Sequence, residues 1–411
     1  MKKLFIMSFT LLALLLLSIF NLFSFQAKAQ ENNSHVPGQV LIKFKDGATE
    51  TEKNNLLKNS HAQVTGKIDA LGVLVLQVPD KAEEKLVVAL SKNSHVEYAE
   101  LDYIAQAFLT PNDTYFTANQ WGLENSGQTI KGVAGVVDAD IDAATAWEET
   151  QGGVKAAILD TGIDQDHEDL YEKIVDQKNF TTSPTIDDLY GHGTHVGGIV
   201  AAKTDNNLGV AGGCPSCQLM NGKVLNDSGS GAYSWIANGI TWAADNGAKV
   251  VNLSLGGSVK STTLEKAVNY AWNKQVVVVA AAGNSANPSK TYPAAYTNAI
   301  AVAATNNKDQ KASFSSYGSK WVDVAAPGEN IFSTFPNHPY KINKSLGYDF
   351  GSGTSMATPM TSAVAALIWS TPYGTSASAV RARLESTADD ITGTGTYWSA
   401  GRINAANAVA P

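Results

Sequence analysis

Hydrophobic positions in the last three quarters of the chain form short uninterrupted runs, which alternate with longer segments of helical periodicity. Such runs are typical of parallel strands covered by helices on both faces, because neither side of the strand meets water. The pattern predicts an α/β domain with a mainly parallel sheet and a functional site beyond the carboxyl ends of its strands. We expect strands at 154–160, 218–225, 250–255, 275–282 and 299–304, and helices at 192–202, 233–246, 264–274 and 355–370.

The segment from about residue 31 to residue 108 follows another pattern. Apolar runs at 40–44, 73–78 and 96–98 surround two helix-like stretches at 50–59 and 81–91. This order is that of a β-α-β-β-α-β unit, so we expect a small α+β ferredoxin-like domain ahead of the larger one. The segment holds no clustered nucleophile, base or metal-ligand set, and its small size predicts modest stability.

The first residues form a third pattern. Lys2 and Lys3 precede an apolar run from Leu4 to Phe25, and the tripeptide Ala-Lys-Ala at 27–29 supplies small residues at the −3 and −1 positions of a cleavage site. These features predict a secretory signal peptide, residues 1–29. The alternative is an uncleaved membrane anchor, since the run is long enough to span a bilayer. We expect a secreted, extracellular protein without a membrane segment after the cut.

Composition narrows the class of protein further. The 411 residues carry a net charge of −8, which argues against a nucleic-acid binder because such proteins present a basic face. A hydrophobic content of 44% supports a sizeable core and excludes a mainly disordered chain. Two cysteines are too few for a disulfide-rich scaffold or a four-thiolate metal site. A compact α/β enzyme fits these values.

Three short motifs lie where a site is expected. Asp160 follows the strand 154–159, His192 opens a helix, and Ser355 begins the apolar helix 355–370. Each has an ordinary alternative: a turn aspartate, half of a zinc site with His195, and a helix N-cap. Zinc is disfavoured because no H-E-x-x-H pattern is present.

Together the three side chains make a chemical unit. A serine hydroxyl is a weak nucleophile until an imidazole accepts its proton. A buried carboxylate fixes the imidazole tautomer and stabilises the cation that forms. The set therefore predicts nucleophilic acyl transfer.

The chain contains five short motifs, which are Asp160-Thr161-Gly162-Ile163, Gly191-His192-Gly193-Thr194-His195-Val196, Ser254-Leu255-Gly256-Gly257, Ala281-Ala282-Gly283-Asn284 and Gly353-Thr354-Ser355-Met356-Ala357-Thr358-Pro359. In these motifs the chain from about Thr110 to its end resembles the subtilisin family of secreted serine endopeptidases, peptidase family S8, and its thermitase-like members in particular. The acid–base–nucleophile order along the chain is the order known for subtilisins. The resemblance implies a subtilisin-like domain at 109–411 and a propeptide at 30–108 that acts as a folding aid and intramolecular inhibitor.

The resemblance also assigns roles by position. Asp160 would orient the imidazole, His192 would be the general base and acid, and Ser355 the nucleophile. Asn284 and the backbone N–H of Ser355 would donate to the oxyanion, where the alternative for Asn284 is a plain loop asparagine. The two edges that pair with the substrate backbone would be Ser254, Leu255 and Gly256 on one side and Gly229, Ser230 and Gly231 on the other.

The implied activity is the hydrolysis of peptide bonds in proteins by a monomeric enzyme. No charged side chain stands out between Ala281 and Tyr292, so we expect a preference for large apolar residues at P1. Two alternatives remain: an inactive relative that only binds, and an esterase, since the same chemistry cleaves esters. One departure from the family pattern is the sequence Met-Thr-Ser-Ala at 360–363, in place of His-Val-Ala-Gly, which predicts different helix packing behind the nucleophile.

Cys214 and Cys217 have the C-x-x-C spacing. A zinc site would need two further ligands, and a thioredoxin-like redox pair would need another fold context. In an oxidising compartment we favour a local disulfide that fixes a surface turn before the strand at 218–225.

Thermitase-like enzymes resemble one another in a calcium site near the N-terminus of the mature domain. The matching positions are Asp113, Asp169, Asn206 and the carbonyls of Lys203, Leu208 and Val210. Several oxygen ligands at a loop suit a hard cation, and the alternative is a turn rich in Asx residues. A second calcium ion is not expected, because its loop between 179 and 190 is shorter and mostly Thr and Ser, with only Asp187 and Asp188 remaining.

The propeptide interpretation predicts a processing bond. Cleavage after Phe108 would place an aromatic side chain in S1 and Ala107 in S2, and would leave a new N-terminus ahead of Asp113. A cut one to three residues earlier is the alternative.

Overall fold

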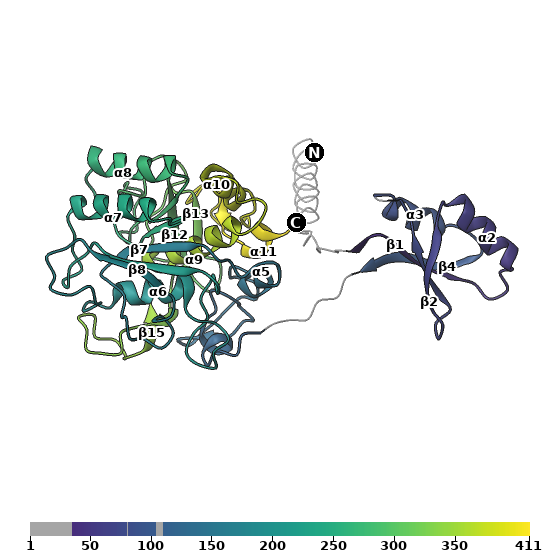
Figure 1. Cartoon of the computed structure of the whole chain (residues 1–411), viewed down its shortest axis with the longest axis horizontal. Helices are drawn as coiled ribbons and strands as arrows, with labels where there is room; N and C mark the ends of the chain where they lie inside the picture. The colour runs from purple at the N-terminus through teal and green to yellow at the C-terminus, as the bar shows by residue number, and fades with distance from the viewer. Residues whose placement is uncertain (1–34, 80, 104–109) are drawn as a thin grey trace, which may run out of the picture. The chain divides into compact units, whose positions relative to one another are not determined.

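A computed structural model describes residues 35–79, 81–103 and 110–411, which fall into two compact units that divide between Ala107 and Phe108 (Figure 1). The expected signal peptide at 1–29 and the expected processing bond at 108–109 lie outside the described residues. In the part of the chain that is described, no helix combines the length and apolarity needed to cross a bilayer.

The N-terminal unit is an antiparallel sheet in the order β2-β3-β1-β4 with two helices, which confirms the expected ferredoxin-like arrangement. Its elements are β1 (His35–Phe44), α2 (Glu50–Asn59), β2 (Gln63–Ile68), β3 (Val73–Gln77), α3 (Glu83–Leu90) and β4 (Val96–Tyr103). Strand β2 was missing from the apolar runs because it lies at the sheet edge and almost all of its residues are exposed. The side chain of Thr49 accepts from Glu52 N–H, and the Glu52 side chain reaches back to Thr49 N–H, so a capping box fixes the start of α2.

The C-terminal unit is built on an eight-stranded parallel sheet in the order β16-β13-β12-β11-β10-β7-β9-β8. Its strands are β7 (Lys155–Asp160), β8 (Ile174–Asn179), β9 (Gln218–Lys223), β10 (Val250–Leu253), β11 (Val277–Ala281), β12 (Ala299–Thr305), β13 (Val324–Pro327) and β16 (Gly401–Arg402). Two small hairpins complete the strands: β5 (Thr129–Ile130) with β6 (Val133–Ala134), and β14 (Ile331–Thr334) with β15 (Tyr348–Gly351).

Helices cover both faces of this sheet, as the continuous apolar strands predicted. Helices α6 (His192–Ala201) and α9 (Thr354–Trp369) pack on one face, and α7 (Tyr233–Asp245) and α8 (Thr262–Asn273) on the other (Figure 1). Each face has its own hydrophobic core, so the sheet is buried from both sides. The remaining helices are α4 (Phe116–Asn119), α5 (Ala143–Glu149), α10 (Ala377–Ser386) and α11 (Ala405–Val409).

The strand ends differ from the sequence prediction at the edge that matters most. Strand β9 ends at Lys223 rather than at 225, and β10 ends at Leu253 rather than at 255. Hydrophobicity continues past both ends because Leu225 and Leu255 line a groove beyond the sheet. Strand β8 was not predicted because it lies at the sheet edge and four of its six residues are polar.

The helix α9 is the most deeply placed element of the unit. Of its sixteen residues, all but Ser355 and Trp369 are buried. Met360, at the position where the family pattern has His, is 3% exposed, and its methyl group lies against Gly122. Hydrophobic packing therefore takes the place of an imidazole behind the nucleophile.

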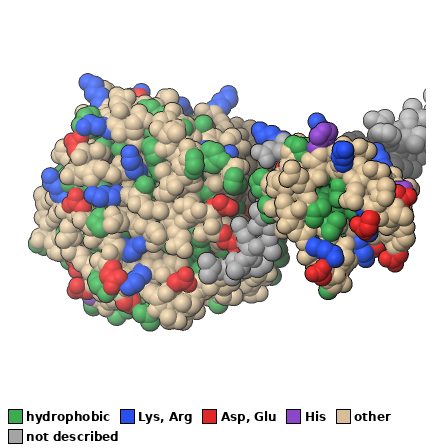
Figure 2. Space-filling view, turned by 45° about the vertical axis from the view of Figure 1, so that its right-hand side comes forward, with side chains coloured by type: hydrophobic (Ala, Val, Ile, Leu, Met, Phe, Trp, Pro, Cys, Tyr) green, Lys and Arg blue, Asp and Glu red, His purple; other side chains and the backbone are tan. Residues whose placement is uncertain are grey.

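Charged side chains on the visible faces of both units are scattered singly or in small groups of mixed sign (Figure 2). The faces seen in this view show no continuous basic stripe of the kind that phosphate backbones require.

Candidate active site

Three neighbouring strands deliver polar residues to the same edge of the sheet. Asp160 ends β7, Ser254 follows β10, and Asn284 lies three residues past the end of β11. Strands β10 and β11 lie on one side of β7, whereas β9 and β8 lie on the other, so the strand order reverses at β7. A crevice beyond the carboxyl ends is expected at such a switch point.

The side chains of Asp160 and His192 meet directly at this edge of the sheet. Asp160 Oδ1 and His192 Nδ1 are 2.7 Å apart, and the Asp160 side chain is fully buried. Burial opposes the charged form of His192, but the charge and hydrogen bond of Asp160 and the charge of Asp188 outweigh it, so the pKa of His192 is raised. Because the carboxylate accepts from Nδ1–H, the lone pair of Nε2 is left to act as the base.

Asp188 fixes the start of the helix that carries His192. The carboxylate accepts from Gly191 N–H and Thr194 N–H at 2.8 Å each, from Tyr190 N–H at 3.2 Å, and from the hydroxyls of Thr161 and Thr194. The carboxylate is fully buried, and burial raises its pKa. The hydrogen bonds from Gly191, Thr194 and Thr161 oppose this rise. The sequence analysis missed this role, because Asp188 precedes the histidine motif without any local pattern of its own.

Close backbone packing accounts for the glycine after His192. A Cβ at Gly193 would lie 2.0 Å from the Gly162 carbonyl oxygen, so no side chain fits. The loop after β7 and the first turn of α6 therefore touch through their backbones, which brings Asp160 within reach of His192.

Ser355 lies in the first turn of α9, and Gly353 is the N-cap. Its hydroxyl donates to the Ser254 carbonyl at 3.1 Å, and the Ser254 hydroxyl donates to the Ser355 carbonyl at 2.8 Å. The two bonds tie Ser355 to the end of β10. The expected N-cap alternative for Ser355 is wrong, since its hydroxyl bonds to another segment.

Asn284 is oriented by the residue before the nucleophile. Thr354 donates to Asn284 Oδ1 through its N–H at 2.9 Å and through its hydroxyl at 3.0 Å. The Thr354 hydroxyl itself accepts from Gly283 N–H at 3.0 Å. With Oδ1 held by two donors, the Nδ2 amide is the group that can donate to a ligand.

The two segments proposed as substrate edges line one groove of about 420 Å³ together with His192. Residues from both edges take part: Gly229, Ser230 and Gly231, and Ser254, Leu255 and Gly256. The sequence analysis did not single out the other residues of the wall, which are Thr161, Tyr190, Leu225, Tyr233 and Ile236. Tyr190 directly precedes the Gly-His-Gly motif, and this position next to His192 could have identified it as a residue of the groove. The expected preference for apolar residues at P1 was based on the stretch 281–292. The charged residue in this stretch is Lys290, and its side chain is exposed.

The residues proposed for calcium also come together. Asp113 and Asp169 are buried, and the loop 203–210 wraps around them, with Val210 N–H donating to Asp169 Oδ2 and Asp205 N–H to Asp113 Oδ2 at 3.0 Å each. Burial raises the pKa of Asp113 to about 6, opposed by backbone hydrogen bonds and reinforced by the charge of Asp169.

Several oxygen atoms at this place fit a hard cation. Asp113 Oδ1 is buried without a hydrogen-bond partner in the described residues. The carbonyls of Lys203, Leu208 and Val210 accept no backbone hydrogen bond from the described residues. Asn206 is turned differently: its Nδ2 donates to Asp169 at 2.7 Å, and its Oδ1 accepts from Leu208 N–H. The ligand set fits calcium, with Asn206 the member whose amide faces away from that role.

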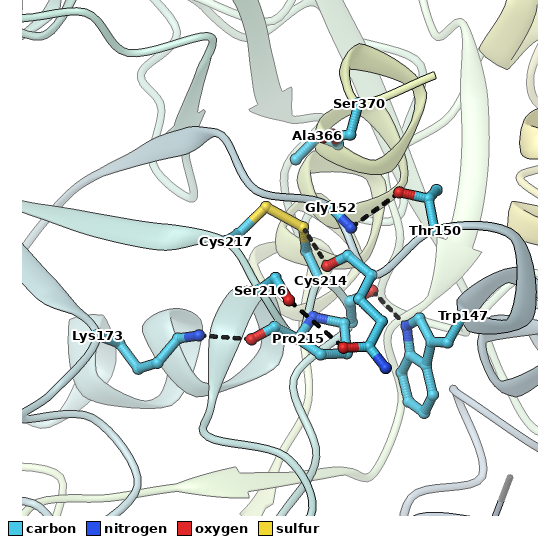
Figure 3. Close-up of a disulfide and its surroundings, with 12 residues drawn as sticks. Trp147, Thr150, Gly152, Lys173, Cys214, Pro215, Ser216, Cys217, Ala366 and Ser370 are labelled. Carbon is cyan, nitrogen blue, oxygen red and sulfur yellow. Dashed lines mark hydrogen bonds between the residues drawn. A yellow bond between two sulfur atoms is a disulfide. The ribbon is translucent and has the colours of Figure 1, made fainter. Parts of the chain in front are cut away.

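The two cysteines form a disulfide in the structure (Figure 3). Both are fully buried, so the sulfur atoms lie below the surface turn that the sequence suggested, and only the tip at Ser216 is exposed. The surrounding chain is bonded to the turn: Trp147 donates to the Gly213 carbonyl at 3.1 Å and Lys173 to the Pro215 carbonyl at 2.5 Å.

His195 does not share a ligand site with His192. Its Nε2 lies 3.1 Å from the Ile331 carbonyl, and the ring is fully buried. Burial and the nearby His192 lower its pKa to about 3, so it stays neutral. The half-site for zinc considered from sequence is therefore wrong for this pair.

Comparison with known families agrees with this geometry. Residues 151–402 match the model of the Subtilase family, peptidase S8. Residues 23–102 match the model of the Fervidolysin N-terminal prodomain.

Individual relatives cover most of the chain. Thermitase of Thermoactinomyces vulgaris is 50% identical over 302 residues, which are 73% of this chain and 99% of thermitase. The thermophilic serine proteinase of Bacillus sp. strain AK1 is 42% identical over 384 residues, 93% of this chain and 89% of that protein. A solved structure of a protease from Pseudoalteromonas arctica PAMC 21717 has a TM-score of 0.64 and 31% identity, and covers 74% of this chain and 99% of its own.

Proposed function

This chain belongs to the subtilase family of serine endopeptidases, and we propose that it cleaves proteins through an acyl-enzyme on Ser355, with His192 and Asp160 as the other members of the triad. The observation that carries the proposal is the 2.7 Å contact between Asp160 and His192, at the same edge of the sheet as Ser355. The family match names the activity, and the contact supports the proposed roles of these residues.

The reaction begins when the Ser355 hydroxyl turns from the Ser254 carbonyl to His192. His192 Nε2 takes the proton as Oγ attacks the carbonyl carbon of the scissile bond, and Asp160 stabilises the imidazolium. The tetrahedral intermediate collapses with transfer of this proton to the leaving amine. Water then attacks the acyl carbonyl carbon while His192 takes its proton. The second tetrahedral intermediate collapses, His192 returns the proton to Ser355 Oγ, and the carboxylic acid product leaves.

Asn284 Nδ2 and the Ser355 N–H would hold the oxyanion. Support comes from the two Thr354 donors that fix Asn284 Oδ1, because a donor that is already oriented needs no reorganisation when charge develops.

The groove favours peptides over simple esters. Its two edges are short backbone segments that contain Gly229, Gly231 and Gly256, so an extended chain can lie between them and pair through main-chain hydrogen bonds. We propose broad specificity with large apolar residues at P1. A peptide library varied at P1 tests this preference.

The N-terminal unit would serve as an intramolecular inhibitor that is removed on maturation, in agreement with its prodomain match. Export by the segment 1–29, an extracellular location and a monomeric state complete the proposal. One structural calcium ion would bind at Asp113 and Asp169, where an unpartnered buried carboxylate oxygen supports it. Its role would be to hold the loop 203–210, with no part in the chemistry.

Digestion of casein by the wild type and by Ser355→Ala tests the function. We expect hydrolysis by the wild type and none by the variant. Ser370→Ala, at the far end of the same helix, is the matched control and should be fully active. Equal digestion by wild type and Ser355→Ala would contradict the proposal, and hydrolysis of esters without hydrolysis of casein would favour an esterase.

A further inference from the structure

A second cluster of ligand-type side chains lies where three loops meet, outside the groove. Asp164 follows β7, Asp187 precedes α6, and His338 lies in the connection between β14 and β15. One ligand-type atom from each lies within 4.8 Å of the other two, and no other group of three such residues was found in the described ranges. The mechanism proposed above uses none of these side chains.

Main-chain N–H groups hold the two carboxylates of this cluster in place. Asp164 accepts from Asp166 N–H at 3.0 Å and Asn337 N–H at 2.8 Å, and Asp187 Oδ1 accepts from Asp188 N–H at 2.9 Å. Each carboxylate oxygen keeps a second lone pair for another partner.

The Nδ1 atom of His338 is also held by a main-chain contact. His338 Nδ1 lies 3.2 Å from the Pro339 carbonyl, an arrangement that places the proton on Nδ1 and the lone pair on Nε2. Metal-ligating histidines are oriented by this kind of contact.

The Nε2 atom of His338 is buried and has no hydrogen-bond partner among the described residues. It lies 3.3 Å from Asp187 Oδ2, which is longer than the 2.7–2.9 Å of a good charge-assisted hydrogen bond. Two ligands about 2.0–2.1 Å from a tetrahedral ion lie about 3.3 Å apart, so the observed spacing matches a metal that bridges the two groups.

We propose that Asp164, Asp187 and His338 bind a divalent transition metal such as Zn²⁺, with water as the fourth ligand. Imidazole nitrogen together with carboxylate oxygen suits Zn²⁺ and Co²⁺, whereas Ca²⁺ takes six to eight oxygen ligands. About 30% of the His338 and Asp187 side chains is exposed, so an ion can enter from solvent.

The bound metal clamps the loop 335–347 to the turn that leads into His192. This loop already contacts the turn through Lys341 N–H to the Leu189 carbonyl at 3.0 Å and Ile342 N–H to the Tyr190 carbonyl at 3.1 Å. A third attachment restricts loop opening, so the metal raises thermal stability without being needed for catalysis.

Metal titration of the mature enzyme tests the proposal. The protein is inactivated with phenylmethylsulfonyl fluoride to stop self-digestion, kept in Ca²⁺, and titrated with Co²⁺ and then with Zn²⁺. We expect one site with the visible absorption of tetrahedral Co²⁺, displacement by Zn²⁺, and a higher Tm in the presence of Zn²⁺.

Two variants at His338 separate metal binding from folding. His338→Ala removes the nitrogen ligand, and His338→Lys removes it while keeping a cation beside Asp187. Both should fold and lose the Co²⁺ spectrum and the Zn²⁺-dependent rise in Tm. Asp245→Asn, which changes an exposed carboxylate bonded to Tyr270, is the matched control and should bind as the wild type does.

Unchanged Co²⁺ binding in both His338 variants would overturn the proposal, since the metal would then lie elsewhere, for example at His192. No binding by the wild type would overturn it as well. Neither result bears on proteolysis, because casein digestion is measured separately.

Discussion

The Asp188 carboxylate accepts a hydrogen bond from the hydroxyl of Thr161 at 2.8 Å, and so joins the end of the strand that carries Asp160 to the helix that carries His192. The Thr161 hydroxyl in turn accepts from Gly193 N–H at 2.9 Å. The distance between Asp160 and His192 is thus held by a second, fully buried carboxylate.

Substitution Asp188→Asn should shift the pH dependence of catalysis. The negative charge of Asp188 contributes to the raised pKa of His192, and the base must be neutral to act. Loss of the charge lowers that pKa, so the acidic limb of kcat/KM moves to lower pH while the maximum rate falls. Rates are measured from pH 5 to 9 and normalised by active-site titration.

Asp166→Asn, which changes an exposed carboxylate in the loop after β7, serves as the control for Asp188 and should leave the limb in place. A limb at the same pH in wild type and Asp188→Asn would show that Asp188 acts on structure alone.

Asn284→Ala should reduce kcat with little change in KM, because the amide donates only when the oxyanion forms. In subtilisins the loss of such a donor is known to lower kcat by about 10²–10³. Steady-state kinetics on a chromogenic peptide provide both constants. Asn287→Ala, in the same loop, is the control, since its side chain accepts only from Ser289 N–H. An equal fall in both variants would assign the effect to loop structure.

Removal of calcium should lower stability and leave the fold otherwise intact. A ligand present at 100 times its Kd stabilises by about 2.7 kcal/mol, and EDTA withdraws this contribution. We expect a lower Tm in EDTA, recovery when Ca²⁺ is added back, and a much smaller response in Asp113→Asn. Calorimetry of the inhibited enzyme measures all three. The same Tm with and without EDTA would exclude a structural calcium ion.

Asn221→Val should raise stability. Asn221 is fully buried in β9, and neither its Oδ1 nor its Nδ2 has a partner in the described residues. Removing an unsatisfied buried amide from a strand is worth about 1–3 kcal/mol. Denaturant unfolding of the inhibited enzyme measures the change, and kcat/KM should stay within about twofold.

Asn252→Val is the matched comparison for Asn221→Val. Asn252 is equally buried in β10, but its Nδ2 donates to Ser254 at 2.9 Å and its Oδ1 accepts from Ser362 at 2.9 Å. Its replacement leaves the Ser362 hydroxyl without its partner and removes one of the two hydrogen bonds of the Ser254 hydroxyl, so it should destabilise. Destabilisation of similar size in both variants would mean that Asn221 is satisfied by bound water.

Self-processing predicts a longer product from Ser355→Ala in a protease-deficient host. The wild type should begin near Leu109, and the variant near Gln30 or Glu31, because the nucleophile that cuts the propeptide is missing. N-terminal sequencing of both secreted proteins gives the result. A variant that matures to the wild-type N-terminus would assign the cut to another protease.

The fold class and the position of Asp160 could be predicted because both depend on the order of neighbouring residues along the chain. The strand ahead of Asp160 is apolar at every position between flanking residues, so its burial could be predicted. The edge strand β8 could not, since half of its residues face water and carry no periodic signal. Its place is set by pairing with β9 alone.

The contacts around the site depend on long-range packing and could not be predicted in the same way. Asp188 receives donors from two separate segments, and nothing in its neighbours along the chain indicates this. Asp187 and His338 meet across about 150 residues of sequence. Motifs identify the reacting groups, whereas the groups that hold them are found only in three dimensions.

The deep burial of α9 affects where this enzyme is open to self-digestion during storage. A protease in solution is surrounded by copies of itself, and a peptide bond is cut only after its segment opens locally. With fourteen of sixteen residues buried, α9 should open far more rarely than the exposed loops do. Self-digestion should therefore begin in the loops and spare the helix that carries Ser355.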